Sequence, residues 1–430
     1  MTRKTWILVI ASVLVLIILS KGQVCATDAD GRKKIVVFQD GTSSAVQRTV
    51  VALSGSTVIH PLAFIDALAI ELPVGEPDQA LAFLLNYSVL GVRPVAGVYH
   101  DLVVSVLPIT PALPGEVRLE EGYDWGLKHI GVDVARQEMP DLTGIGVQVA
   151  IVDTGISCGH PDLPLLIDGF NALPGGVLYC DDHGHGTHMA GIIAARTNRA
   201  AIMGAAPGAG LVAVKVLNAR GQGYLSDLLN GLQWIYNNQG EENIRLVNMS
   251  LGFSRASPPL ESAIKKLVDH GTIMVASAGN SCSDGPGQDE DGGEEGDGPA
   301  CDTPQTTTVK YPAAYSGVLA VTATDEDDRI ASYSLEGPEV AVTAPGGMRQ
   351  AKRILSTYLG GWYGFGSGTS QAAAHVTGAL ALKLQQQRAL SLDDIQWLLQ
   401  HTSTVLVGYS RLQQGWGMIS AESLLAHPNR

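Results

Sequence analysis

Short apolar runs of strand length alternate with helical stretches over the larger part of the chain, from about Tyr123 onward. Apolar runs predict buried strands at residues 147–152, 211–217, 246–250, 272–276 and 318–323. Apolar residues at helical spacing predict helices at residues 188–195, 226–237 (with Ser226 as N-cap) and 260–270. This alternation predicts an α/β fold, with a doubly wound, mainly parallel sheet and helices on both faces. Ligands bind such sheets at the carboxyl ends of the strands.

The N-terminal part of the chain shows a smaller and different pattern. It predicts strands at residues 33–38, 67–72 and 89–98, and helices at 39–53 and 76–86. This β-α-β-α-β order predicts a small α+β domain at residues 27–105. Three prolines, Pro108, Pro111 and Pro114, then predict an extended linker at 106–122. The larger domain follows at 123–430.

The first 26 residues have the pattern of a secretory signal peptide. Arg3 and Lys4 precede an apolar run at residues 6–19, and residues 24–26 (Val-Cys-Ala) resemble a small-residue cleavage site. The run is shorter than the ~20 residues that a membrane-spanning helix needs. We therefore expect cleavage after Ala26 and a secreted protein, extracellular or periplasmic. An uncleaved membrane anchor is the alternative.

Composition and charge narrow the class of protein. Hydrophobic residues make up 45% of the chain and charged residues 16%, which is enough apolar surface for a large buried core. The formal net charge of -14 argues against a nucleic-acid partner, because a phosphate-binding surface needs an excess of Lys and Arg.

Four cysteines remain once the predicted signal peptide is removed: Cys158, Cys180, Cys282 and Cys301. An even number of cysteines in an exported protein predicts two disulfides. Three pairings are open, and we expect the local ones, Cys158–Cys180 and Cys282–Cys301. The second would close the base of a Gly-rich, acidic segment at 284–302, which we expect to be an exposed loop without an assigned role.

A serine stands where a flexible, glycine-containing stretch at 366–369 meets an apolar helical stretch. Ser370 therefore lies at the expected start of a buried helix, where backbone N–H groups are unpaired and the helix dipole is positive. Such a place suits a nucleophile that passes through an oxyanion intermediate. The alternative is a serine that acts only as a helix cap.

Other polar residues stand where predicted strands or loops meet turns and helices. Asp153 ends the strand at 147–152, Asn280 follows the strand at 272–276, and His185 comes just before the helix at 188–195. Each could be a turn residue on its own. Zinc is not expected at the three nearby histidines, since neither the H-E-x-x-H motif nor further ligands at the right spacing are present.

The order Asp, His, Ser along the chain is that of subtilisin, and the chain resembles the subtilisin-like serine proteases closely over residues 125–425. The matching stretches are VAIVDTGI (149–156), HPDL (160–163), HGTHMAG (185–191), APGAGLVAVKVL (206–217), NMSLG (248–252), ASAGN (276–280), YPA (311–313) and GTS (368–370). Residues 33–100 resemble, more weakly, the inhibitory propeptide of this family. The resemblance implies a secreted endopeptidase that is made as a precursor and cuts its own linker between about residues 100 and 122.

The resemblance also implies roles for individual residues. Ser370 would be the nucleophile, His185 its general base, and Asp153 would orient the imidazole. Asn280 and the backbone N–H of Ser370 would form the oxyanion hole. Ser250, Leu251 and Gly252 would pair with the backbone of a protein or peptide substrate. Alternatives are a membrane-tethered processing protease and, disfavoured because all these residues are present, an inactive binding protein of the same fold.

The chain departs from the family at a few positions. Gln371 and Ala374 replace a large apolar residue and a proline just after the serine. Lys310 stands where the family commonly has a small residue near the floor of the primary specificity pocket. An inward-pointing Lys310 would favour acidic residues at the cleavage site, whereas the alternative is an exposed lysine on a loop.

The resemblance implies no cofactor for the chemistry but a structural calcium ion. Asp162 and Asn198 match a carboxylate and a loop amide of the family's common calcium site, and hard oxygen ligands suit this ion. We expect the protein to act as a monomer, with its own propeptide as an intramolecular inhibitor.

Overall fold

The computed structural model describes residues 31–88, 91–106, 110–111, 122, 124–198, 201–242, 244–281, 308–348 and 351–428. The predicted signal peptide, most of the predicted linker, Cys282, Cys301 and the acidic segment at 284–302 lie outside these ranges. Within them, no helix has both the length and the apolar character that a bilayer-spanning segment requires.

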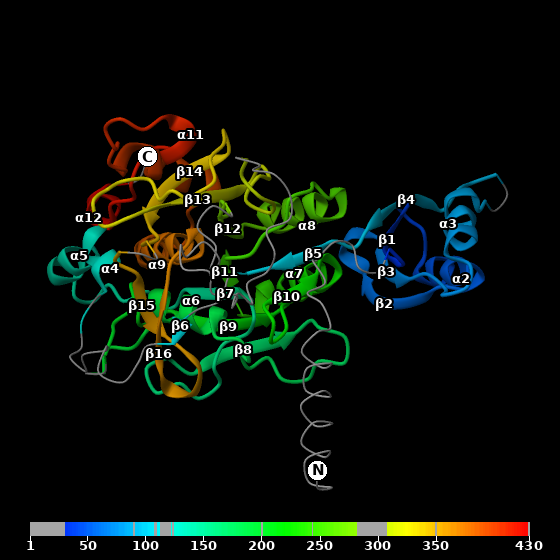
Figure 1. Ribbon diagram of the computed structural model, residues 1–430, viewed down its shortest axis with the longest axis horizontal. Coiled ribbons are helices and arrows are strands. Elements are labelled where there is room, and N and C mark those ends of the chain that lie inside the picture. The colour runs from blue at the N-terminus through cyan, green and yellow to red at the C-terminus, as the bar shows by residue number, and fades with distance from the viewer. Residues whose placement is uncertain are drawn as a thin grey trace, which may run out of the picture.

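A sheet of seven strands runs through the larger part of the protein (Figure 1), in the order β14-β13-β12-β11-β7-β9-β8, and every neighbouring pair is parallel. Its strands are β7 (Gln148–Asp153), β8 (Leu166–Asn171), β9 (Gly210–Lys215), β11 (Ile244–Met249), β12 (Ile273–Ser277), β13 (Val318–Thr324) and β14 (Val340–Pro345). The predicted doubly wound α/β fold is thereby confirmed. The sequence prediction omitted β14 and β8, and β8 is an edge strand of half-exposed residues without an apolar run.

Helices cover both faces of this sheet. They are α4 (Trp125–His129), α5 (Val132–Glu138), α6 (His185–Ala194), α7 (Leu225–Glu242), α8 (Pro258–Asp269), α9 (Thr369–Gln386), α10 (Leu392–Thr402), α11 (Arg411–Gln414) and α12 (Ala421–Ala426). Val149 and Ile151 of β7 belong to the core that contains α6 and α9, whereas Ala150 and Val152 belong to the core that contains α7 and α8. Because successive side chains of a strand point to opposite faces, an apolar run in β7 serves both cores.

Two helices begin earlier than the sequence predicted. Helix α6 starts at His185 instead of residue 188, because the Asp181 carboxylate accepts hydrogen bonds from the N–H groups of His183, Gly184 and Thr187 at 2.9, 3.0 and 2.9 Å. These contacts satisfy donors that a helix start leaves unpaired. His185 therefore lies in the first turn of a helix and not in the loop before it.

Helix α7 starts at Leu225, so the prediction of Ser226 as its N-cap is wrong. The N–H and hydroxyl of Ser226 both donate to the Asp101 carboxylate, each at 2.7 Å. Asp101 belongs to the N-terminal part of the chain, and a cap contributed from so distant a segment is not visible in a local sequence pattern. Burial raises the pKa of Asp101 to about 6.

The N-terminal unit is a four-stranded antiparallel sheet with two helices, to the right in Figure 1. Its elements are β1 (Lys33–Phe38), α2 (Ser44–Leu53), β2 (Thr57–Leu62), a 3₁₀ turn η1 (Ala63–Ile65), β3 (Ala67–Glu71), α3 (Pro77–Asn86) and β4 (Val95–His100). The predicted β-α-β-α-β order lacked β2, where His60 and Pro61 interrupt the apolar pattern. The last strand also lies later than the predicted range of 89–98.

A short strand after this unit joins it to the larger part. Strand β5 (Val103–Ser105) pairs antiparallel with β10 (Gln222–Tyr224), and Ser105 also bridges Gly252. Strand β6 (Thr110–Pro111) pairs with β16 (Tyr363–Gly366), which pairs in turn with β15 (Ile354–Thr357). The chain thus contacts the larger part both before and after residues 107–109.

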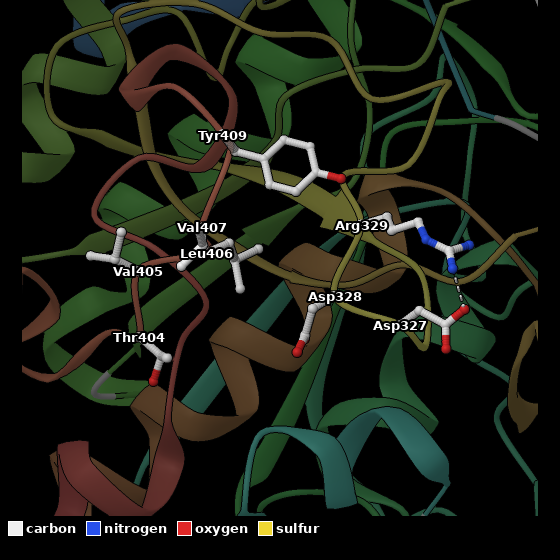
Figure 2. A pocket seen from close by; sticks show the side chains of 8 residues that line it. All are labelled: Asp327, Asp328, Arg329, Thr404, Val405, Leu406, Val407 and Tyr409. Atoms are coloured by element: carbon white, nitrogen blue, oxygen red, sulfur yellow. Dashed lines mark ion pairs between the residues drawn. The ribbon is translucent and has the colours of Figure 1, made fainter.

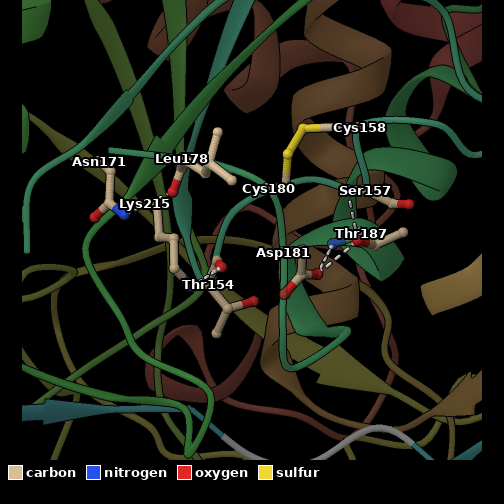
Figure 3. Close-up of a disulfide and its surroundings, with 9 residues drawn as sticks. All are labelled: Thr154, Ser157, Cys158, Asn171, Leu178, Cys180, Asp181, Thr187 and Lys215. Carbon is tan, nitrogen blue, oxygen red and sulfur yellow. Dashed lines mark hydrogen bonds between the residues drawn. A yellow bond between two sulfur atoms is a disulfide. The ribbon is translucent and has the colours of Figure 1, made fainter. Parts of the chain in front are cut away.

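The predicted disulfide Cys158–Cys180 is present (Figure 3) and joins residues 22 positions apart. Cys158 follows the end of β7, and Cys180 precedes the start of α6. Ile156 and Cys180 also form a parallel bridge. The disulfide therefore ties the segment after Asp153 to the segment before His185.

Removing this disulfide should lower the stability of the folded chain. In the chain-entropy model, closing a loop of this length raises the free energy of the unfolded state by about 3 kcal/mol. We expect Cys158→Ser, Cys180→Ser and the double variant each to lose a similar free energy of unfolding, measured by urea denaturation at equilibrium. Unchanged midpoints and slopes in all three variants would contradict a structural role for the bond.

Candidate active site

The order of strands brings three predicted site residues to one edge of the sheet. Strands β7, β11 and β12 are neighbours, and their carboxyl ends lie together because they are parallel. Asp153 is the last residue of β7, Ser250 directly follows β11, and Asn280 comes shortly after β12. Residues far apart in the sequence are thereby placed at one edge of the sheet.

A buried carboxylate–imidazole pair forms the centre of this site. The His185 Nδ1 lies 2.8 Å from Asp153 Oδ1 and 2.9 Å from Oδ2, and both side chains are almost fully inaccessible. The Thr154 N–H also donates to Asp153 Oδ1 at 2.7 Å. A carboxylate facing Nδ1 holds the proton there and leaves Nε2 as the basic nitrogen. That Nε2 has no hydrogen-bond partner among the residues described.

Ser370 is the second residue of α9, as the sequence predicted, at the positively polarised end of that helix. Its hydroxyl donates to the carbonyl of Ser250 at 3.2 Å, and the hydroxyl of Ser250 donates to the carbonyl of Ser370 at 3.0 Å. The structure shows no hydrogen bond between Ser370 and His185. Catalytic hydrogen bonds often tighten only when a substrate is bound.

The side-chain amide of Asn280 is oriented by Thr369. Its Oδ1 accepts the N–H of Thr369 at 3.0 Å and the hydroxyl of Thr369 at 3.1 Å. That hydroxyl also accepts the N–H of Gly279 at 3.1 Å. Because the amide oxygen is engaged, the amide nitrogen remains as a donor that can face the crevice beside Ser370.

The predicted substrate-binding segment already holds an extended strand. The Gly252 N–H donates to the Ser105 carbonyl at 3.4 Å, and the Val106 N–H donates to the Gly221 carbonyl at 3.0 Å. Leu251 packs in the core, so this residue offers a backbone surface and not an exposed side chain. The segment at 250–252 and β10 thus together hold one antiparallel strand, β5, between them.

Lys310 lies next to the same segments. A Cβ atom placed on Gly279 would come 2.9 Å from Lys310 Cγ, and one placed on Gly252 would come 3.3 Å from Lys310 Cβ. The stem of Lys310 therefore runs along Gly252 and Gly279. The side chain is half-buried, and burial lowers its pKa. The alternative of a fully exposed loop lysine is wrong.

The two predicted calcium ligands lie in neighbouring segments. Asp162 is fully buried and accepts the hydroxyl of Tyr363 at 3.2 Å, while the amide nitrogen of Asn198 donates to the Pro161 carbonyl at 3.3 Å. In the part of the chain that the structure describes, no group of three or more His, Cys, Asp or Glu side chains could hold a metal ion. Backbone carbonyls would have to complete a calcium site here.

The histidines around His185 do not form a metal site. His188 places Nε2 at 3.1 Å from the Gly364 carbonyl, and burial lowers its pKa to about 3. Burial likewise lowers the pKa of His375 in α9 to about 4. Both imidazoles stay neutral at ordinary pH and belong to the packed interior.

Sequence reasoning missed three residues that position the site: Asp181, Lys215 and Thr369. Lys215 is buried at the end of β9 and donates to Asp182 Oδ1 at 2.6 Å, to the Thr154 carbonyl at 2.6 Å and to the Leu217 carbonyl at 2.9 Å. Lys215 thus links the segment that follows Asp153 to the segment that precedes His185. A lysine inside an apolar strand was the signal that could have identified it.

A separate surface pocket of about 410 Å³ contains none of these site residues (Figure 2). Its lining combines charged and apolar side chains, from Asp327, Asp328, Arg329, Thr404, Val405, Leu406, Val407 and Tyr409. Asp153, His185 and Ser370 are not among the lining residues, so we assign the pocket no part in the chemistry.

Comparisons with known proteins agree with this geometry. Residues 144–417 match the model of the subtilase family, Peptidase_S8. Subtilisin E of Bacillus subtilis is 30% identical over 430 residues, which cover 98% of this chain and 99% of that protein. Subtilisin Savinase of Lederbergia lenta is 38% identical over 303 residues, which cover 70% of this chain and 98% of that protein.

A third relative, the thermostable alkaline protease of Halalkalibacterium halodurans, is 36% identical over 291 residues, which cover 68% of this chain and 71% of that protein. The family match spans the sheet, the segments that carry Asp153, His185 and Ser370, and the helices on both faces. The chain belongs to the subtilase family and is a subtilisin-like serine endopeptidase.

Proposed function

We propose that Asp153, His185 and Ser370 form the catalytic triad of a secreted endopeptidase that matures its own precursor. The observation that carries the proposal is the buried Asp153–His185 pair at the carboxyl edge of the sheet, with Ser370 at the start of α9. The proposed substrates are proteins and peptides, and the enzyme acts as a monomer without a cofactor in the chemistry.

The proposed reaction follows from the geometry of these groups. His185 Nε2 removes the proton of Ser370 as its hydroxyl attacks the scissile carbonyl, and Asp153 stabilises the imidazolium that forms. Nε2 then gives the proton to the leaving amine, and water resolves the acyl-enzyme by the same route. The Asn280 amide and the Ser370 N–H donate to the oxyanion.

Asn280→Ala should therefore reduce kcat far more than it changes KM. In subtilisin, a relative of this chain, loss of one such donor is known to cost about 10²–10³-fold in kcat. Steady-state hydrolysis of a peptide substrate measures both constants. Asn238→Ala, which removes an amide that bonds the Trp234 carbonyl on α7, is the matched control. Equal kcat in the two variants would contradict the role of Asn280.

The N-terminal unit is proposed to inhibit the enzyme until it is removed. In support, β5 occupies the edge between β10 and Gly252 where a substrate strand would bind, and Asp101 caps α7. The proposed divisions are a signal peptide at 1–26, an inhibitory propeptide at 27–105, a processing region at 106–122 and a catalytic domain at 123–430. The linker between about residues 100 and 122 is then the substrate of self-cleavage.

Ser370→Ala should leave the precursor uncut, because the nucleophile that cleaves the linker is missing. Intact-mass measurement of the purified protein should show the full precursor for this variant and a shorter form for the unaltered chain. Ser262→Ala, at an exposed position on α8, is the control and should be processed normally. Normal processing of Ser370→Ala would refute self-maturation.

Labelling with a fluorophosphonate separates the enzyme from an inactive binding protein of the same fold. The probe should modify the unaltered chain after the N-terminal unit is removed, and it should not modify Ser370→Ala. Intact-mass measurement also distinguishes a secreted form, which has lost residues 1–26, from a membrane-tethered form, which retains them.

A structural calcium ion near Asp162 and Asn198 is also proposed, since a carboxylate and an amide from neighbouring segments are the oxygen donors this ion prefers. A chelator should lower the melting temperature, because an ion present at a hundred times its Kd stabilises the folded state by about 2.7 kcal/mol. Asp162→Asn should abolish this sensitivity to chelator. Identical melting curves with and without chelator would contradict the site.

A further inference from the structure

Lys310 is half-buried and differs from the buried Lys215 and Lys383 in having no partner among the described residues. The Lys215 ammonium donates to three oxygens, and Lys383 donates to the His427 carbonyl at 2.9 Å. For Lys310 the structure gives neither a side-chain hydrogen bond nor an ion pair with any described residue, and burial alone lowers its pKa. A half-buried cation without a partner loses hydration and gains nothing in return.

The position of Lys310 indicates that its partner is a side chain of the substrate. Its stem lies along Gly252, whose backbone receives the strand β5, and along Gly279, the neighbour of Asn280. A substrate bound like β5 would run along residues 250–252 with its scissile carbonyl between Ser370 and Asn280. The residue whose carbonyl is attacked would then place its side chain between the segments that contain Gly252 and Gly279, towards Lys310.

The two glycines let the lysine stem approach these segments closely. A Cβ atom on Gly279 would come within 3.0 Å of Leu335 Cδ1 as well as of the lysine stem, and one on Gly252 would come 3.3 Å from the Tyr311 carbonyl. Gly279 also has φ of +106°, which side chains with a Cβ rarely adopt. The absence of a Cβ atom at these positions therefore allows the Lys310 stem to lie against both backbone segments.

We propose that the Lys310 ammonium binds a carboxylate side chain of the substrate, so that the enzyme cleaves proteins after glutamate and aspartate. The inference rests on the proposed function, because it assumes that Ser370 and Asn280 act on the bond next to that side chain. A charge-assisted hydrogen bond formed in a partly desolvated site is stronger than a neutral one. We therefore expect the enzyme to prefer a carboxylate side chain over the amide side chain of the same shape.

The acidic segment at 284–302 is the competing source of a counter-charge, and it lies outside the described residues. A carboxylate of that segment paired with Lys310 would neutralise the ammonium before substrate arrives. In that case glutamate and glutamine substrates would be cleaved equally well. The experiment below therefore decides between the two partners.

The test compares internally quenched peptides that differ only in the residue before the cleaved bond, as the pairs Glu/Gln and Asp/Asn. For the purified active enzyme we expect kcat/KM to favour Glu over Gln, and Asp over Asn, by roughly tenfold or more, as a charge-assisted bond implies. Lys310→Met should bring both ratios to about one by loss on the acidic peptides alone. Lys310→Gln, which keeps a hydrogen-bond donor without the charge, should do the same.

Lys265→Met is the matched control, since it removes one positive charge from the exposed face of α8. It should leave both ratios as in the unaltered enzyme. Ratios near one in the unaltered enzyme, or ratios that survive both Lys310 variants, would overturn the inference while the fluorophosphonate still labels Ser370. Failure of labelling and of cleavage of every peptide would instead refute the proposed function and this inference with it.

Discussion

The buried Asp153 carboxylate is the constraint on which the arrangement of this site depends. A charge without solvent access is tolerated only if hydrogen bonds replace the water that it has lost. His185 Nδ1 and the Thr154 N–H supply these bonds, so the end of β7 and the start of α6 must meet within hydrogen-bond distance. Lys215 and the disulfide Cys158–Cys180 join the same two segments and restrict their separation.

A second set of contacts fixes the segments around Ser370. The reciprocal bonds of Ser250 and Ser370 join the end of β11 to the start of α9, and Thr369 joins that start to Asn280 after β12. Helix α9 begins at Thr369 and runs without a break through Gln371 and Ala374, so the absence of the family's usual proline is compatible with a regular helix. Gln371 itself is buried.

The sequence was sufficient for those features that depend on local patterns. Apolar runs predicted the central parallel strands, and the polar residues at strand ends predicted which side chains would meet. It failed where distant segments decide the outcome. Asp181 moves the start of α6, Asp101 caps α7 in place of Ser226, and β2 pairs despite His60 and Pro61. Such contacts depend on tertiary structure and leave no mark in a local window.

Among the residues that the structure describes, three polar groups near the start of α9 have no hydrogen-bond partner: His185 Nε2, the Asn280 amide nitrogen and the Lys310 ammonium. Buried or half-buried polar groups usually have hydrogen bonds, and each exception needs a physical reason. Asp153, Thr369 and Lys215 in the same region do have hydrogen-bond partners. In the proposed reaction the Ser370 proton, the oxyanion and an acidic side chain of the substrate would satisfy these three groups in turn. The positions of these three groups therefore indicate where the proposed substrate would bind.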